Sequence, residues 1–225
     1  MQQKDLLVQR VFNLFSNNYK LENGGRSMKE FVVNGIVNYI ISNQSYSSDD
    51  TDKIKYGVAN LYLQISKLTV ITLLAIIFKI FIPYLIFTFT FYAIRSTAFG
   101  LHSKKSYQCW IWSILIFIGI PYLCTILNIV MPVKIAILIF VIIYISIYSP
   151  ADTAKRPIVS PKRRIFFKYC STMISVIYAF FVVYLKDQIV ANSLLFSLVL
   201  QCFIISPVTY KMLGMTYNNY KRYKK

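Results

Sequence analysis

Residues 110–131 read WIWSILIFIGIPYLCTILNIVM, a continuous stretch without a charged side chain. An α-helix rises about 1.5 Å per residue, so roughly 20 apolar residues cross the hydrocarbon core of a bilayer. In lipid a helix satisfies its backbone hydrogen bonds internally, whereas an isolated strand does not. The stretch therefore predicts a transmembrane helix.

Apolar stretches of this kind recur along the chain. We distinguish six, at about 67–82, 83–99, 110–131, 133–149, 165–185 and 188–210. The first two are short, contain Lys67 and Lys79, and meet at Pro83, so they form either two tilted spans or a helical hairpin. A chain that is 56% hydrophobic and has only eight acidic residues does not suit a soluble globule. The sequence predicts an all-α fold, a polytopic integral membrane helical bundle of about six transmembrane segments.

The remaining regions are more polar. Residues 1–66 are predicted to form an N-terminal amphipathic and cytoplasmic region, and residues 211–225 a basic cytoplasmic tail. Within the first region, residues 27–42 predict an amphipathic helix too short to span a membrane, and residues 47–52 predict a loop or a helix start. We expect no secretory signal peptide, because Lys4 and Arg10 interrupt the first apolar residues.

Basic residues dominate the charge, with 25 Lys and Arg and a net charge of +17. If the N-terminus is inside, 22 of them fall in segments expected on the cytoplasmic side, and Lys79, Lys134 and Lys186 lie in or beside the outside turns. This asymmetry predicts a multi-pass cell-membrane protein with both termini in the cytoplasm. It also makes anionic lipid a simpler partner than nucleic acid, which we do not expect.

The polar interruption at residues 95–109 reads RSTAFGLHSKKSYQC. It holds the single histidine, His102, and then Cys109, with Lys104 and Lys105 between them. A thiol is nucleophilic as the thiolate, which nearby cations, a helix N-terminus or an imidazole favour. The interruption predicts a cysteine nucleophile with a histidine base on the cytoplasmic side. The alternative is that His102 is an interfacial residue at headgroup level and Cys109 only begins a span.

Geometry sets a condition on this pair. Positions seven apart on one helix stand about 10.5 Å apart along its axis, too far for a hydrogen bond. His102 must therefore lie off the helix that carries Cys109, and Gly100 permits a break because it adopts backbone angles closed to other residues. One histidine and four scattered cysteines give no metal-ligand spacing, so we expect no metal and no cofactor.

A second polar motif, SPADTAKRPI at residues 149–158, follows about forty residues later. Asp152 within it reads on its own as a turn or cap residue. Together the two motifs resemble the accessory gene regulator protein B (AgrB) family, membrane-embedded cysteine endopeptidases of Gram-positive quorum sensing. The resemblance covers roughly residues 30–210 in length, basic charge and span order. One departure is Phe99, where many relatives have a second glycine before Gly100.

The resemblance implies a substrate, a short propeptide with an amphipathic N-terminal helix, a cysteine-containing signal sequence and an acidic C-terminal tail. Residues 67–210 would form the transmembrane peptidase domain. His102 would be the general base, and Cys109 would attack the carbonyl that joins signal to tail. The propeptide's own thiol, or a hydroxyl, would then displace Cys109 and close a thiolactone or lactone.

Basic residues near these motifs are candidates for binding the acidic tail of such a propeptide. The alternative is that they only orient the flanking spans and contact anionic lipid. The candidates are Arg95, Lys104, Lys105, Lys155, Arg156, Lys162 and Arg163. The sequence leaves the oligomeric state open, a homo-oligomer included.

Two other classes of function compete with an enzyme. A transporter or channel is disfavoured because no acidic residue lies deep within an apolar stretch, where ion-coupled transporters commonly place one. A scaffold whose basic loops bind partners or lipid would tolerate loss of the Cys109 thiol, and an enzyme would not.

Overall fold

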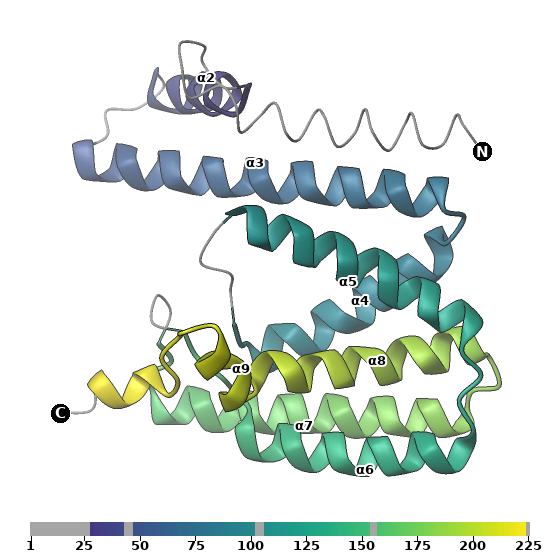
Figure 1. The fold of residues 1–225 in the computed structure, drawn as a ribbon. Coiled ribbons are helices and arrows are strands. Elements are labelled where there is room, and N and C mark those ends of the chain that lie inside the picture. The colour runs from purple at the N-terminus through teal and green to yellow at the C-terminus, as the bar shows by residue number, and fades with distance from the viewer. Residues whose placement is uncertain (1–27, 43–46, 102–105, 154–156, 224–225) are drawn as a thin grey trace. The chain divides into compact units, whose positions relative to one another are not determined.

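The computed structural model describes residues 28–42, 47–101, 106–153 and 157–223 (Figure 1). The chain divides into two compact units, Met1–Val70 and Ile71–Lys225. The first unit contains α2 (Met28–Ser42), which confirms the short helix predicted at 27–42. It also contains most of α3 (Ser48–Ile77). Ser47 caps α3, because its hydroxyl accepts the Asp50 N–H at 3.2 Å, so residues 47–52 are a helix start.

The boundaries expected for the first two apolar stretches are wrong. One helix, α3, runs from Ser48 to Ile77, and the chain then breaks at residues 78–80, where Lys79 takes a φ of 59°. The next helix, α4, spans Phe81–Ala98 and contains Pro83 in its first turn. Proline is tolerated there because the first-turn N–H groups have no partner within the helix. Pro83 therefore follows the break between the helices and does not make it.

The second unit continues with α5 (Ser106–Ile126), α6 (Met131–Tyr148), α7 (Pro161–Tyr184), α8 (Gln188–Ile205), the short α9 (Pro207–Met212) and a 3₁₀ helix, η1 (Asn219–Tyr223). Within the described part of the chain, five helices are long and apolar enough to cross a membrane, namely α3, α5, α6, α7 and α8. The helix α4, which carries Arg95, is not among them. These elements confirm an all-α, polytopic membrane bundle.

The helix α8 is the centre of the second unit. It packs against α4, α5, α6 and α7, and 56% of its residues are buried, against 17–22% in the other four candidate spans. Small residues such as Ala191 and Ser197 let neighbouring helices approach it closely. The Ser197 hydroxyl hydrogen bonds the Thr90 hydroxyl of α4 at 2.8 Å, and Tyr178 of α7 donates to the Thr90 carbonyl at 2.9 Å.

The outward faces of these helices are apolar. Large side chains such as Phe89, Phe140 and Phe203 are 63–78% exposed. Contiguous exposed apolar surface is unusual for a soluble protein and suits contact with lipid.

The second unit has two distinct ends (Figure 1). The helices α4, α6 and α8 end, and α5 and α7 begin, at what we call the site end. The opposite end carries Lys79, Lys134 and Lys186, the three cations that the sequence assigns to the outside turns. Lys134 is buried there and donates to the Gln188 amide oxygen at 2.7 Å. The segregation of charge between the two ends fits the predicted orientation, which stays a prediction.

Candidate functional site

The chain leaves α4 through a turn at residues 98–101, the pinned turn. Phe99 has φ 55° and ψ −141°, and Gly100 has φ 117°. Arg95, one turn earlier, donates to the Phe99 carbonyl at 3.0 Å and also to the Leu101 carbonyl. The guanidinium therefore holds the turn's own backbone.

The helix α8 fixes the same turn from the other side. Gln201 donates its amide to the Phe99 carbonyl at 2.8 Å, and the Leu101 N–H donates to the Ile204 carbonyl at 3.3 Å. A Cβ added to Gly100 would lie 2.7 Å from Ile204 Cγ2 and 3.0 Å from the Ile204 carbonyl oxygen. Glycine is needed here for two reasons, a positive φ and a close approach to α8.

Cys109 lies in the first turn of α5 and is half-buried. His102, Lys104 and Lys105 lie outside the described residues, between the pinned turn and α5. Of the three other cysteines, Cys124 and Cys202 are buried within the bundle, and Cys170 is half-buried within α7, away from its first turn. Among the described thiols, Cys109 is therefore the one that follows the pinned turn at the start of a helix.

The second motif packs against the pinned turn. The Ala151 N–H donates to the Ala98 carbonyl at 3.0 Å, and Ala151 pairs with Phe99 as an isolated parallel bridge. The Phe99 ring meets the Phe167 ring of α7 edge to face, with 4.9 Å between centroids. Residues 149–153, which we call the Asp152 loop, are thus adjacent to the turn that leads to His102.

The basic candidates of the second motif are partly described. Lys155 and Arg156 lie outside the described residues. Lys162 and Arg163 are exposed on the first turn of α7. Their exposure leaves them available to lipid headgroups or to a substrate.

Sequence reasoning did not anticipate Gln201 as part of the site, and it placed Arg164 only among the basic residues of the connection after the fourth apolar stretch, without its contacts. Gln201 is fully buried in α8, and its amide oxygen has no hydrogen-bond partner among the described residues. An amide inside an apolar run is itself a signal, because polar groups in membrane spans are costly. Arg164 stacks on Tyr220 at 3.6 Å, a contact that no local sequence pattern predicts.

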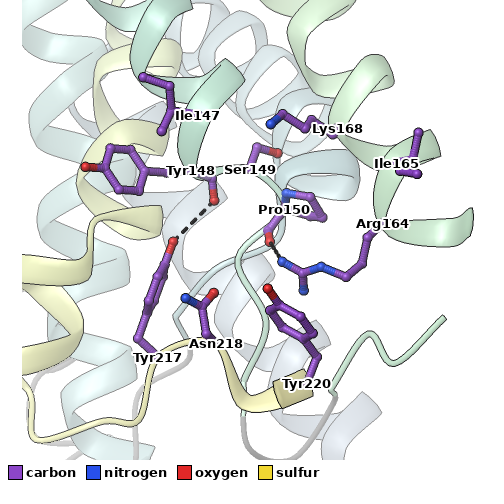
Figure 2. Close-up of a pocket in the computed structure, with 10 residues that line it drawn as sticks. All are labelled: Ile147, Tyr148, Ser149, Pro150, Arg164, Ile165, Lys168, Tyr217, Asn218 and Tyr220. Atoms are coloured by element: carbon purple, nitrogen blue, oxygen red, sulfur yellow. Dashed lines mark hydrogen bonds between the residues drawn. The ribbon is translucent and has the colours of Figure 1, made fainter. Parts of the chain in front are cut away.

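A cavity of about 420 Å³ lies at the site end, among the end of α6, the start of α7 and residues 217–220 (Figure 2). Arg164 and Lys168 line it, with no carboxylate among the described lining residues. Tyr217 closes one side and donates to the Tyr148 carbonyl at 3.5 Å. Burial raises the pKa of Tyr217 to about 12, so this phenol stays protonated at neutral pH. The cavity is therefore cationic and partly aromatic, a combination suited to an anionic group.

Among the described residues, no group of three or more His, Cys, Asp and Glu side chains is close enough to hold a metal ion. The chemistry open to the described site is thus that of a thiol at a helix start, backbone N–H groups and cationic side chains.

The sequence matches the family model of Accessory gene regulator B over residues 33–205. A protein of Clostridium acetobutylicum described as AgrB-like is 30% identical over 173 residues, which cover 77% of this chain and 83% of that protein. Accessory gene regulator protein B of Staphylococcus aureus is 36% identical over 106 residues, 47% of this chain and 56% of that protein. No solved structure matches the chain. The family match spans both polar motifs and the helices that carry them, and the chain therefore belongs to the AgrB family.

Proposed function

We propose that this chain is a membrane-embedded cysteine endopeptidase that removes the C-terminal tail of a quorum-sensing propeptide and promotes ring closure. Family membership supports a role in accessory gene regulator quorum sensing. The observation that carries the finer proposal is the pinned turn, since four hydrogen bonds from Arg95, Gln201 and Leu101 fix the backbone that leads to His102. A structure this constrained suits the presentation of a catalytic base next to a thiol.

The first step forms an acyl-enzyme. Cys109 Sγ attacks the carbonyl carbon between signal and tail, and the thiol proton passes to His102. His102 then gives this proton to the leaving amine, so the tail departs as a free peptide and the signal remains as a thioester. The first-turn N–H groups of α5 lack partners within the helix and are candidate donors to the oxyanion.

The second step closes the ring. The propeptide's thiol attacks the thioester carbonyl, its proton returns through His102 to Cys109 sulfur, and a thiolactone leaves the regenerated enzyme. Exchange of one thioester for another has little free-energy cost, provided that water is kept from the intermediate. The apolar surroundings of α5 and α8 support such exclusion.

The cationic site end supports docking of an acidic propeptide tail. Lys162 and Arg163 are exposed on α7, and Lys168 lines the cavity. Exposed ion pairs contribute only about 0–1 kcal/mol each, so neutralising several together should raise KM with little change in kcat. The matched control is Lys186→Gln, an exposed cation at the opposite end. If KM and its dependence on salt are unchanged when Lys162, Arg163 and Lys168 are neutralised together, these cations serve membrane orientation alone.

The central test replaces the thiol. Cys109→Ala should abolish cleavage of the propeptide substrate, while the protein still inserts into the membrane. Cys170→Ala, at a half-buried cysteine of α7, is the control and should keep activity. Cleavage that survives in Cys109→Ala would contradict the proposal and leave a scaffold or transporter as the better explanation.

A further inference from the structure

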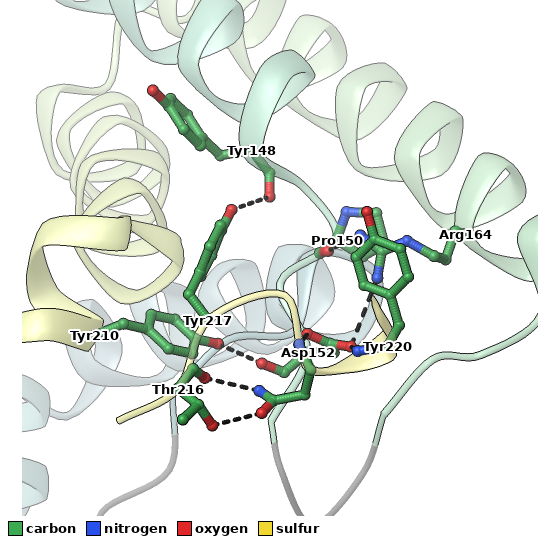
Figure 3. Close-up of polar contacts among 9 residues, drawn as sticks. Tyr148, Pro150, Asp152, Arg164, Tyr210, Thr216, Tyr217 and Tyr220 are labelled. Carbon is green, nitrogen blue, oxygen red and sulfur yellow. Dashed lines mark hydrogen bonds and ion pairs between the residues drawn. The ribbon is translucent and has the colours of Figure 1, made fainter. Parts of the chain in front are cut away.

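Asp152 is a buried carboxylate with partners far away in the sequence. It is 2% exposed, and its two oxygens accept the N–H groups of Asn219 at 3.0 Å and Tyr220 at 2.8 Å (Figure 3). These are the first two residues of η1. Asp152 is therefore a cap, as its sequence context suggested, but of a helix that begins 67 residues later.

Arg164 completes the same cluster. One guanidinium nitrogen lies 3.7 Å from the Asp152 carboxylate, another donates to the Pro150 carbonyl at 3.4 Å, and the group stacks on the Tyr220 ring (Figure 3). Tyr210 adds a hydrogen bond from its hydroxyl to the Asp152 carbonyl at 2.9 Å. We call residues 213–223 the tail segment. The tail segment holds the Asp152 loop through the Asp152 side chain, and α9 holds it through the Asp152 backbone carbonyl.

The Asp152 loop in turn holds the pinned turn. Ala151, which precedes Asp152, donates its N–H to the Ala98 carbonyl and pairs with Phe99. A carboxylate this buried is costly unless it is hydrogen-bonded and paired. Its partners are two backbone N–H groups of the tail segment and, at 3.7 Å, the guanidinium of Arg164 on α7. The position of the loop therefore depends on the tail segment.

We propose that Asp152 is a positioning residue and that the tail segment is a working part of the peptidase site. The chain of contacts runs from η1 through the Asp152 carboxylate and the Ala151 N–H to the pinned turn, and His102 follows that turn in the sequence. This inference rests on the proposed function for its catalytic consequence, but the chain of contacts stands without it. It gives a second role to residues that the sequence presents only as a basic tail.

The test compares two capping aspartates in the full-length chain in lipid nanodiscs. Asp152→Asn removes the charge that the tail segment surrounds. Asp187→Asn is the matched control, because Asp187 also accepts two backbone N–H groups, at 2.8 and 3.2 Å, but at the opposite end of α8. Tyr220→Ala is a second variant that removes the stacking partner of Arg164 and leaves Asp152 intact.

Two quantities are measured for each variant, the hydrogen-exchange rates of two amides and the kinetics of propeptide cleavage. Hydrogen exchange of the Leu101 and Ala151 amides should become about tenfold faster in Asp152→Asn and about threefold faster in Tyr220→Ala, and stay unchanged in Asp187→Asn. Propeptide cleavage by Asp152→Asn should lose about tenfold in kcat with KM unchanged, since substrate binding is intact and the base is misplaced. A merely structural role would lower the amount of folded enzyme without this split.

If the Leu101 and Ala151 amides exchange at wild-type rates in both Asp152→Asn and Tyr220→Ala, the chain of contacts is wrong. Faster exchange with an unchanged kcat would overturn the positioning role. If Asp152→Asn fails to insert, Tyr220→Ala decides by the same criteria. A wild-type chain that shows no cleavage dependent on Cys109 would refute the proposed function instead, and the exchange rates would still decide whether the tail segment holds the turn.

Discussion

The most specific way to perturb the pinned turn is to substitute Gly100, because the methyl group of an alanine at this position would press against the backbone of α8. In Gly100→Ala the new Cβ lies 2.7 Å from Ile204 Cγ2 and 3.0 Å from the Ile204 carbonyl oxygen. The Cγ2 atom can rotate away, but the carbonyl oxygen belongs to the central helix α8. The alanine must also adopt a φ of 117°, a conformation that L-residues rarely take.

The magnitude follows from these two costs. A residue held in a sparsely populated backbone region costs about 1–3 kcal/mol, and overpacking against a fixed neighbour costs about 1 kcal/mol more. We therefore expect the pinned turn to lose about 2–4 kcal/mol relative to a turn released from α8. Because about 1.4 kcal/mol corresponds to a factor of ten, the ratio of pinned to released turns should fall roughly 30- to 700-fold.

The assay is hydrogen exchange of the Leu101 amide, whose N–H donates to Ile204, combined with the rate of propeptide cleavage. Exchange should become faster by this factor, and cleavage should become slower in proportion to the fraction of turns that are released, if the turn positions the base. Gly119→Ala is the control, since Gly119 lies in α5 with nothing within 4 Å of an added Cβ. That substitution removes a helix glycine and should be neutral or stabilising by up to about 1 kcal/mol.

A folded Gly100→Ala protein whose Leu101 amide exchanges at the wild-type rate would refute the steric reasoning. Fast exchange together with unchanged cleavage would show that the chemistry does not depend on the turn.

Three further predictions use other parts of the structure. In an otherwise cysteine-free chain, a single cysteine at position 186 (Lys186→Cys) should be labelled by an impermeant maleimide in intact cells. A single cysteine at position 160 (Ser160→Cys) should be shielded from it, and the reverse pattern would invert the proposed orientation. Gln201→Leu should speed exchange at Leu101 less than Gly100→Ala does, because it removes one bond of about 1 kcal/mol and Arg95 still donates to Phe99. Tyr217 has a pKa raised by burial to about 12, against about 10 when unfolded, so its contribution to stability is present below pH 10 and lost as pH rises through 12. The midpoint temperature of thermal unfolding in detergent should therefore fall less steeply with pH above pH 10 in Tyr217→Phe than in the wild type.

The helices were predictable because lipid imposes a simple rule on sequence. A long apolar run must be helical, and every run from residue 110 onward overlaps a helix of the structure. The start of α3 was not predictable by the same rule, since its first turns are polar and Ser47 fixes the start through a cap. Hydropathy reports where a helix is buried in lipid and says little about where it begins.

The candidate site divides in the same way. Gly100 and Cys109 stand out by residue type and by their place between apolar runs. The contact of Asp152 with Asn219 and Tyr220 does not, because it joins segments 67 and 68 positions apart and leaves no periodic pattern in either. Gln201 lies between these cases, since its polarity in an apolar helix is visible but its partner, the Phe99 carbonyl, is not.

The dependence of the Asp152 loop on the tail segment also sets an order in time. A ribosome makes residues 213–223 after the five candidate spans, so each span can enter the bilayer before the partners of Asp152 exist. Until then the carboxylate has no donors from η1 and is more stable in water than in the protein. The loop can close only when the last helices have been made, and the pinned turn gains its support from Ala151 at the same moment. A nascent chain with all its spans inserted therefore still lacks the finished site.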